Sequence, residues 1–272
     1  MGSRRPERLF CALLLGRVTS PAGLARPRGL TAREIAPLLI LAVGAWALTV
    51  TIGHGMAGMT GTMGLGLAAF LAVWTLMMAA MMLPSVAPTA SLYARTFQGS
   101  RTARTAGLVV GYLAVWAAAG LPAYGLAWVA GSLTAQHAGT AHILAVAVFG
   151  VCGAYQLSSL KDRCLAHCRS PLALLLHYGS YQGRLRDLRV GVHHGGYCLG
   201  CCWALMVTLV AVGVMNIAAM LGLTALVLLE KVWRWGPATG RIAGAALLAL
   251  AVITVWYPWL APGLRAVPHM MG

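Results

Sequence analysis

The sequence predicts an all-α protein: a polytopic bundle of six transmembrane helices, or of seven if its longest apolar run is broken in two. Three observations predict this class. Of the 272 residues, 60% are hydrophobic and only 9% are charged, whereas soluble domains carry about 25% charged residues. Apolar runs of the length that crosses a bilayer recur along the chain. The basic residues gather between those runs, as in proteins oriented by the positive-inside rule.

The N-terminal segment, residues 1–34, is basic and only weakly apolar. Its short apolar stretch, Leu9 to Leu15, leads into more arginine and not into a small-residue cleavage site, which argues against a signal peptide. We expect a cytoplasmic arm whose arginines lie against anionic headgroups. Those arginines are Arg4, Arg5, Arg8, Arg17, Arg26, Arg28 and Arg33.

A single transmembrane domain is expected over residues 35–261, followed by a tail at 262–272. Five runs have the length of a membrane span, and they lie at about 35–52, 66–91, 106–131, 140–160 and 241–260. A sixth run, about 198–229, would exceed about 40 Å as one helix. It contains Gly213-Val214-Met215-Asn216, which favours either one broken helix or two short ones.

The loop charges predict the orientation. The segments 53–64 and 131–141 carry no charge, whereas the loops after the second and fourth runs are basic. The positive-inside rule therefore places the N-terminus and the basic loops in the cytoplasm, so the expected location is the inner (cytoplasmic) membrane. A six-helix arrangement puts Lys231, Arg234 and Arg241 outside, and a seven-helix arrangement puts them inside. Run length favours six, and the count stays open.

A cytoplasmic Cys/His-rich loop is expected at 161–197, and its cysteines continue into the next run. Thiols stay reduced in the cytoplasm, and reduced cysteine with histidine is a ligand set for Cu(I), Zn or an iron–sulfur centre. Nearby arginines favour the thiolate form. The candidate ligands are Cys164, His167, Cys168, His193, His194, Cys198, Cys201 and Cys202.

Two other interpretations of these cysteines stay open. Buried cysteine often behaves as a small hydrophobic residue, which could explain Cys201 and Cys202 as packing residues. Cys198 and Cys201 could instead cycle through a disulfide.

Methionines form a second candidate ligand set. Met77 and Met81 are four residues apart, as are Met78 and Met82, so each pair shares a helical face. Thioether sulfur suits Cu(I) and avoids the cost of a buried charge. The alternative is that these residues are adaptable core filler.

A third candidate set lies in the uncharged loop after the first run. It consists of His54, Met56, Met59 and Met63, spaced by glycines, and it could wrap a copper ion at the outer face. A flexible turn whose methionines face lipid would have the same composition.

Carboxylates are too few for most enzyme chemistry. Glu230 beside Lys231 indicates an ion pair at the membrane interface. The chain lacks paired carboxylates, a phosphate-binding glycine loop and an ATPase motif, so a hydrolase or an ATP-driven pump is not supported. Nucleic-acid binding is not expected, because no basic, aromatic-laced soluble module is present. A non-enzymatic role is favoured.

Three stretches resemble a bacterial family of unknown function, family 2182, whose members are labelled predicted metal-binding integral membrane proteins. The stretches are Trp74 to Ser85, Cys164 to Pro171, and Tyr197 to Met206 followed by Gly213-x-Met215-Asn216 and Glu230-Lys231. The similarity covers about residues 40–260. It implies a membrane location and metal binding, and it supplies no substrate.

The sequence thus predicts an integral membrane protein that transports or relays a soft metal ion, with Cu(I) favoured and Zn second. The outer loop would capture the ion, the methionines would pass it on, and the cysteines would hold it inside. Its partners would be the lipid bilayer, the metal ion and a soluble metal-carrier protein. The alternatives are a membrane thiol–disulfide oxidoreductase and an accessory subunit with a structural metal.

Overall fold

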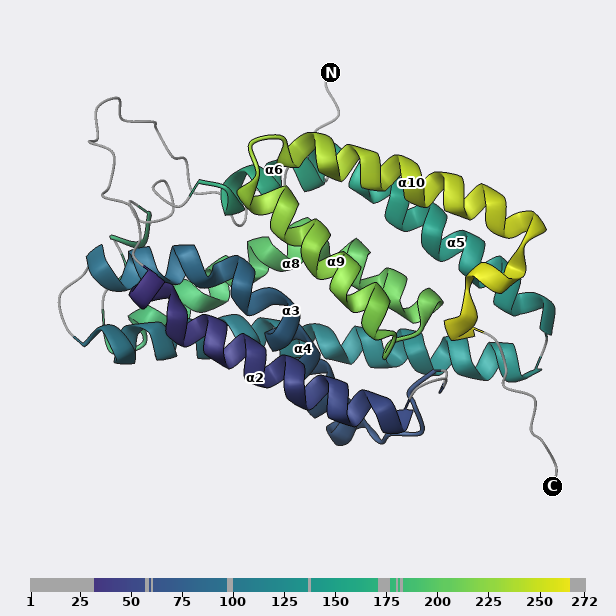
Figure 1. The fold of residues 1–272 in the computed structure, drawn as a ribbon, viewed down its shortest axis with the longest axis horizontal. Helices are drawn as coiled ribbons and strands as arrows, with labels where there is room; N and C mark the ends of the chain where they lie inside the picture. The colour runs from purple at the N-terminus through teal and green to yellow at the C-terminus, as the bar shows by residue number, and fades with distance from the viewer. Residues whose placement is uncertain are drawn as a thin grey trace, which may run out of the picture.

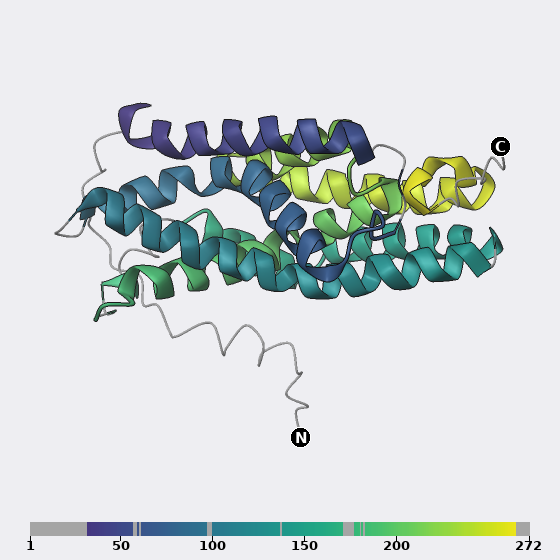
Figure 2. The same ribbon diagram turned by 90° about the horizontal axis from the view of Figure 1, so that it is seen from below.

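The computed structural model describes residues 32–56, 59, 61–96, 100–136, 138–170, 177–179, 181 and 183–264. Nearly all of the expected N-terminal arm, and the tail from residue 265, lie outside the described residues. Within the described part of the chain every regular element is helical, which confirms the all-α class. Figure 1 and Figure 2, which views the molecule from below, both show the long helices running along the long axis of the molecule.

In chain order, the described elements are α2 (Ala32–Met56), α3 (Leu67–Thr96), α4 (Arg101–Gln136), α5 (Ala138–Gln156), α6 (Ser159–Cys168), α8 (Arg186–Val212), α9 (Ile217–Val232), α10 (Gly236–Trp256), and the 3-10 turns η1 (Pro258–Leu260) and η2 (Pro262–Leu264). Five helices are long and apolar enough to cross a membrane, or six if α5 and α6, bent by 62° at their junction, count as one span.

The long apolar run that was expected over 198–229 is broken at residues 213–216. Gly213 has a φ of 111°, a backbone conformation that favours glycine. The Asn216 side chain then caps α9 by accepting a hydrogen bond from the Ala219 amide at 3.0 Å. Helix α9 returns along α8, because Lys231 near its end lies 2.9 Å from the Cys198 sulfur. The tight connection that the seven-helix arrangement required is therefore present.

The reversal of the chain at 213–216 also determines the positions of Lys231, Arg234 and Arg241, whose location depended on the helix count. Arg241 contacts Asp162 at 3.4 Å, and Arg169 donates to the Glu230 carbonyl, so this part of the chain lies beside α6. The described charged residues lie at the starts of α2, α4, α8 and α10, along α6, and at the ends of α3 and α9, which gather toward one end of the bundle (left half of Figure 1). We call it the charged end, and the opposite end the uncharged end.

Glycines bring α4 and α8 into backbone contact. A Cβ added at Gly111 would lie 2.2 Å from the Leu188 carbonyl oxygen, and one at Gly191 would lie 2.0 Å from that of Leu108. Small residues spaced four apart permit such close approach of helices in membrane proteins. The contact places Tyr112 of α4 with its hydroxyl 2.9 Å from the Cys198 sulfur of α8.

The region expected to be a loop over 161–197 is largely helical. Residues 159–168 form α6, whose first turn is capped by the Ser158 hydroxyl accepting from the Lys161 amide. Helix α8 begins at Arg186, about 12 residues before the expected start. The start of α8 could not be predicted from hydropathy, because its first turns are polar. These turns lie at the charged end and are stabilised by packing on α4. The cysteines therefore lie in rigid helices.

The glycine contact can be tested by adding one methyl group. Gly191→Ala should separate α4 from α8 and cost about 1–3 kcal/mol, as expected for an overpacked interior. Gly196→Ala, on the same helix, is the matched control, because a Cβ there meets nothing within 4 Å. Thermal unfolding in detergent micelles measures both. Equal melting temperatures for the two variants would contradict the close contact.

Candidate metal centre

Helix α8 places three thiols on one face. Cys198, Cys201 and Cys202 are three and four residues apart, and their sulfur atoms all lie within 4.8 Å of one another. All three side chains are buried. With metal–sulfur bonds of about 2.3 Å, two thiolates on one ion lie at most about 4.6 Å apart. A small adjustment of rotamers would let the three sulfurs share one ion.

Helix α6 contributes a fourth thiol. The Cys168 sulfur lies 3.9 Å from that of Cys201, well beyond the roughly 2.05 Å of a disulfide. No disulfide joins the described cysteines. We call Cys168, Cys198, Cys201 and Cys202 the thiol cluster. The thiol cluster joins α6 and α8, which are connected by 17 residues.

A partly buried cation lies against the thiol cluster. The Lys231 ammonium of α9 is 2.9 Å from the Cys198 sulfur and 3.1 Å from the Ser85 hydroxyl of α3. The Tyr112 hydroxyl contacts the same sulfur from α4. A neighbouring ammonium favours the thiolate, which is the form that binds metal. Two further helices, α9 and α4, thus contact one cysteine, and α3 contacts the lysine beside it.

The expected pairing of Glu230 with Lys231 is not formed. Adjacent residues on a helix point about 100° apart, so Lys231 reaches the thiol cluster while Glu230 pairs with Lys161 of α6 at 2.7 Å. Both side chains of that pair are only 1% exposed. Because Arg169 also donates to the Glu230 carbonyl, α6 is fastened to α9. This fastening sets Cys168 and Lys231 against α8.

Of the three candidate histidines on α6 and α8, His194 fits the cluster best. It lies one turn before Cys198 on the same face of α8 and is 3% exposed. Its Nδ1 atom is buried without a hydrogen-bond partner. An unpartnered buried nitrogen costs free energy, and ligation of a metal ion would satisfy it.

His167 and His193 lie beside the cluster in a group of aromatic rings. His167 stacks on Tyr197 with ring centroids 3.7 Å apart, and His193 stacks on His177 at 4.9 Å. Burial raises the pKa of Tyr178, and its hydroxyl lies 3.4 Å from Nδ1 of His193, within hydrogen-bond distance. These rings cover the cluster at the charged end.

Cys164 is not within 4.8 Å of all three α8 sulfurs. Its sulfur lies against Gly200, where an added Cβ would be 3.0 Å away. It lines an apolar cavity of about 640 Å³ together with Trp74 and Trp203. Cys164 therefore lies between this cavity and Gly200 of α8, outside the group of three sulfurs.

The four methionines of α3 are completely buried. Met82 accepts a hydrogen bond through its carbonyl from the Ser85 hydroxyl, which itself contacts Lys231. The quartet lies on the side of Ser85 that faces the uncharged end. At about 1.5 Å per residue, its nearest member lies about one turn from Ser85 along α3, and its farthest member lies about 12 Å away. It comprises Met77, Met78, Met81 and Met82.

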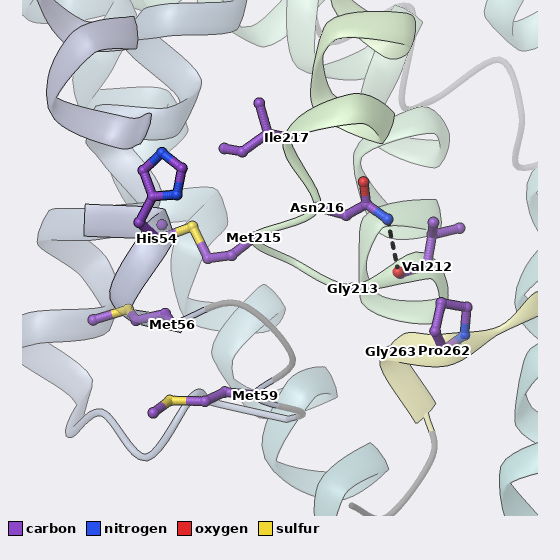
Figure 3. A pocket seen from close by; sticks show the side chains of 11 residues that line it. His54, Met56, Met59, Val212, Gly213, Met215, Asn216, Ile217, Pro262 and Gly263 are labelled. Atoms are coloured by element: carbon purple, nitrogen blue, oxygen red, sulfur yellow. Dashed lines mark hydrogen bonds between the residues drawn. The ribbon is translucent and has the colours of Figure 1, made fainter. Parts of the chain in front are cut away.

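The predicted outer-loop residues lie at the uncharged end. His54, Met56 and Met59 line a pocket together with Met215 of the turn between α8 and α9, as Figure 3 shows. Met63 is 4% exposed and is not among the residues that line this pocket.

Sequence reasoning missed Lys231, Tyr112 and Ser85 as neighbours of the cluster. Each comes from a different helix, and their meeting depends on tertiary packing. The only local signal was Lys231 at the end of an apolar run. The adjacent Glu230 suggested that this lysine forms an ion pair at the membrane interface, and not that it contacts a cysteine.

These features define an all-helical protein with a buried thiol cluster suited to a soft metal ion. The family model for PpoB2, described as copper chaperone, matches residues 71–254. The match covers more than half of the chain, and the chain therefore belongs to this family. The description is copper-related, and it differs from the label of the family that the sequence resembles. Neither a curated protein nor a solved structure matches the chain.

The buried ion pair between α6 and α9 generates a prediction. Glu230→Gln leaves the Lys161 ammonium buried without its counter-charge, and breaking such a pair costs about 3–5 kcal/mol. Replacing both partners, Lys161→Met with Glu230→Leu, should recover most of that loss. Denaturant unfolding of the three proteins measures the effect. A Glu230→Gln variant as stable as the native chain would show that the pair does not hold α6 in place.

Proposed function

We propose that this protein is an integral membrane copper-handling protein that binds Cu(I) at the thiol cluster and passes it on. The observation that carries the proposal is the approach of four buried, free thiols from two helices. The family description supports copper as the cargo. Thiolates accept both Cu(I) and Zn, but the buried methionines next to the cluster are ligands for Cu(I) and not for Zn.

Charge balance also favours a monovalent ion. Two thiolates and Cu(I) together carry one negative charge, and the Lys231 ammonium beside Cys198 would neutralise it. A buried complex of zero net charge avoids most of the desolvation cost that a charged one incurs. Lys231 is therefore the counter-ion of the loaded site.

A route for the ion would run along the bundle. The methionine quartet of α3 begins one turn from Ser85 and extends toward the uncharged end. Several weak sites in series allow an ion both to enter and to leave. At the charged end the cluster would exchange the ion with a soluble metal carrier.

The membrane location and the orientation are parts of the same proposal. Five or six helices have the length and apolarity of membrane spans, and the described charges gather at one end. The positive-inside rule would place that end, with the N-terminus, in the cytoplasm of a bacterium. The thiol cluster would then lie nearer the side on which thiols stay reduced.

Copper binding is the first test. Anaerobic titration with Cu(I) against a chromophoric chelator should show one tight equivalent in the native chain. Cys201→Ser, which removes the central sulfur of the cluster, should weaken Cu(I) binding by about 100-fold or more, because loss of even an outer partner of a metal ligand costs about 10–100-fold. Cys152→Ser is the matched control, because Cys152 is also buried but lies on α5 outside the cluster.

The same proteins separate metal binding from the redox alternative. If Cys201→Ser binds Cu(I) as tightly as the native chain, the cluster is not the site. If alkylation of metal-free protein shows Cys198 and Cys201 switching reversibly between reduced and oxidised forms while Cu(I) does not bind, the oxidoreductase interpretation replaces the proposal.

The orientation makes a separate prediction. A cysteine introduced at Gly66, near the uncharged end, should react with a membrane-impermeant maleimide added to intact spheroplasts. One introduced at Ser100, between α3 and α4 at the charged end, should react only after lysis. Both positions are exposed. The reverse pattern of labelling would exclude the proposed orientation.

A further inference from the structure

A pocket of about 350 Å³ opens at the uncharged end, far along the bundle from the thiol cluster. It is enclosed by the end of α2, the turn between α8 and α9, and η2. Figure 3 shows Met215 reaching from that turn toward the end of α2, where His54, Met56 and Met59 lie. One imidazole and three thioethers therefore line a single cavity.

The reversal of the chain creates this grouping. Gly213 turns the backbone, and an added Cβ at Gly263 would lie 2.3 Å from the Gly213 nitrogen, so η2 holds the turn in place. The Asn216 side chain is engaged in local hydrogen bonds, accepting from Ala219 and donating to Val212. The ligand atoms left to the pocket are those of His54, Met56, Met59 and Met215.

The chemistry of these donors selects a soft cation. No carboxylate lines the pocket, so hard cations such as Mg²⁺ and Ca²⁺ find no suitable ligands. Thioether sulfur binds Cu(I) and contributes no charge. The complex would keep the positive charge of the ion and would be stable only where water reaches it. His54 and Met59 are exposed, whereas Met215 is buried, so the pocket is open on one side.

We propose that this pocket is a second Cu(I) site, separate from the thiol cluster and weaker than it. The choice of Cu(I) as the ion rests on the proposed function. The inference adds copper binding by residues on α2, which precede the segment that the family model matches, residues 71–254. The pocket at the uncharged end has neutral donors, and the thiol cluster nearer the charged end has thiolates. The affinity for Cu(I) would therefore increase from the pocket to the thiol cluster. The sequence placed Met63 in this set, and the structure gives that place to Met215.

The test is a binding titration of the full chain with Cu(I), and in parallel with Ag(I), against chelators of graded strength. The native protein should show two classes of site. The triple variant Met56→Leu, Met59→Leu, Met215→Leu conserves volume and should lose the weaker class by about tenfold or more while the tight class is unchanged. Met63→Leu, on the same segment, should change neither class. His54→Ala should also weaken the weaker class.

The outcomes separate the two proposals. If the native chain has only the tight class, or if the triple variant keeps both classes, the second site is excluded and the thiol cluster stands. If Cys201→Ser removes the tight class and leaves the weaker one, both sites are supported. If the weaker class alone is present in the native chain, the pocket stands and copper binding by the thiol cluster is excluded.

Discussion

The structure depends on one reversal of the chain, at residues 213–216. A glycine with positive φ and a capping asparagine let α9 fold back along α8. Without this turn, Lys231 would not reach Cys198 and Met215 would not face the end of α2. The same four residues therefore set the surroundings of the thiol cluster and complete the pocket at the opposite end. A tight turn is also what brings the basic residues after α9 to the charged end.

The thiol cluster is held by charges that have separate partners. Lys161 and Glu230 neutralise each other in a buried pair, which leaves Lys231 available for the Cys198 sulfur. A buried ion pair contributes little net stability, but losing one partner is costly. The pair thus acts as a fixed joint between α6 and α9. Cys168 is on α6 and Lys231 is on α9. The joint between these two helices therefore fixes the position of both side chains relative to α8.

Much of the helical architecture could be predicted from the sequence, because long apolar runs separated by polar segments have the length and composition of helices that can cross a membrane. The thiols of α8 could be grouped by their spacing alone. Cys168 was named with them from composition, but its approach to Cys201 and the place of Lys231 could not be predicted, since they depend on how α6 and α9 pack. The start of α8 was missed because its first turns are polar, and Met215 was missed because only the folded turn brings it to His54.

Helix α9 has 16 residues, about 24 Å at 1.5 Å per residue, and is thus shorter than a hydrocarbon core of about 30 Å. In a bilayer, such hydrophobic mismatch draws the lipid surface inward beside the short segment. The turn that carries Met215 would then sit in a dimple, with headgroups and water reaching below the general level of the membrane. An ion at that depth would have a shorter stretch of low-dielectric medium to cross.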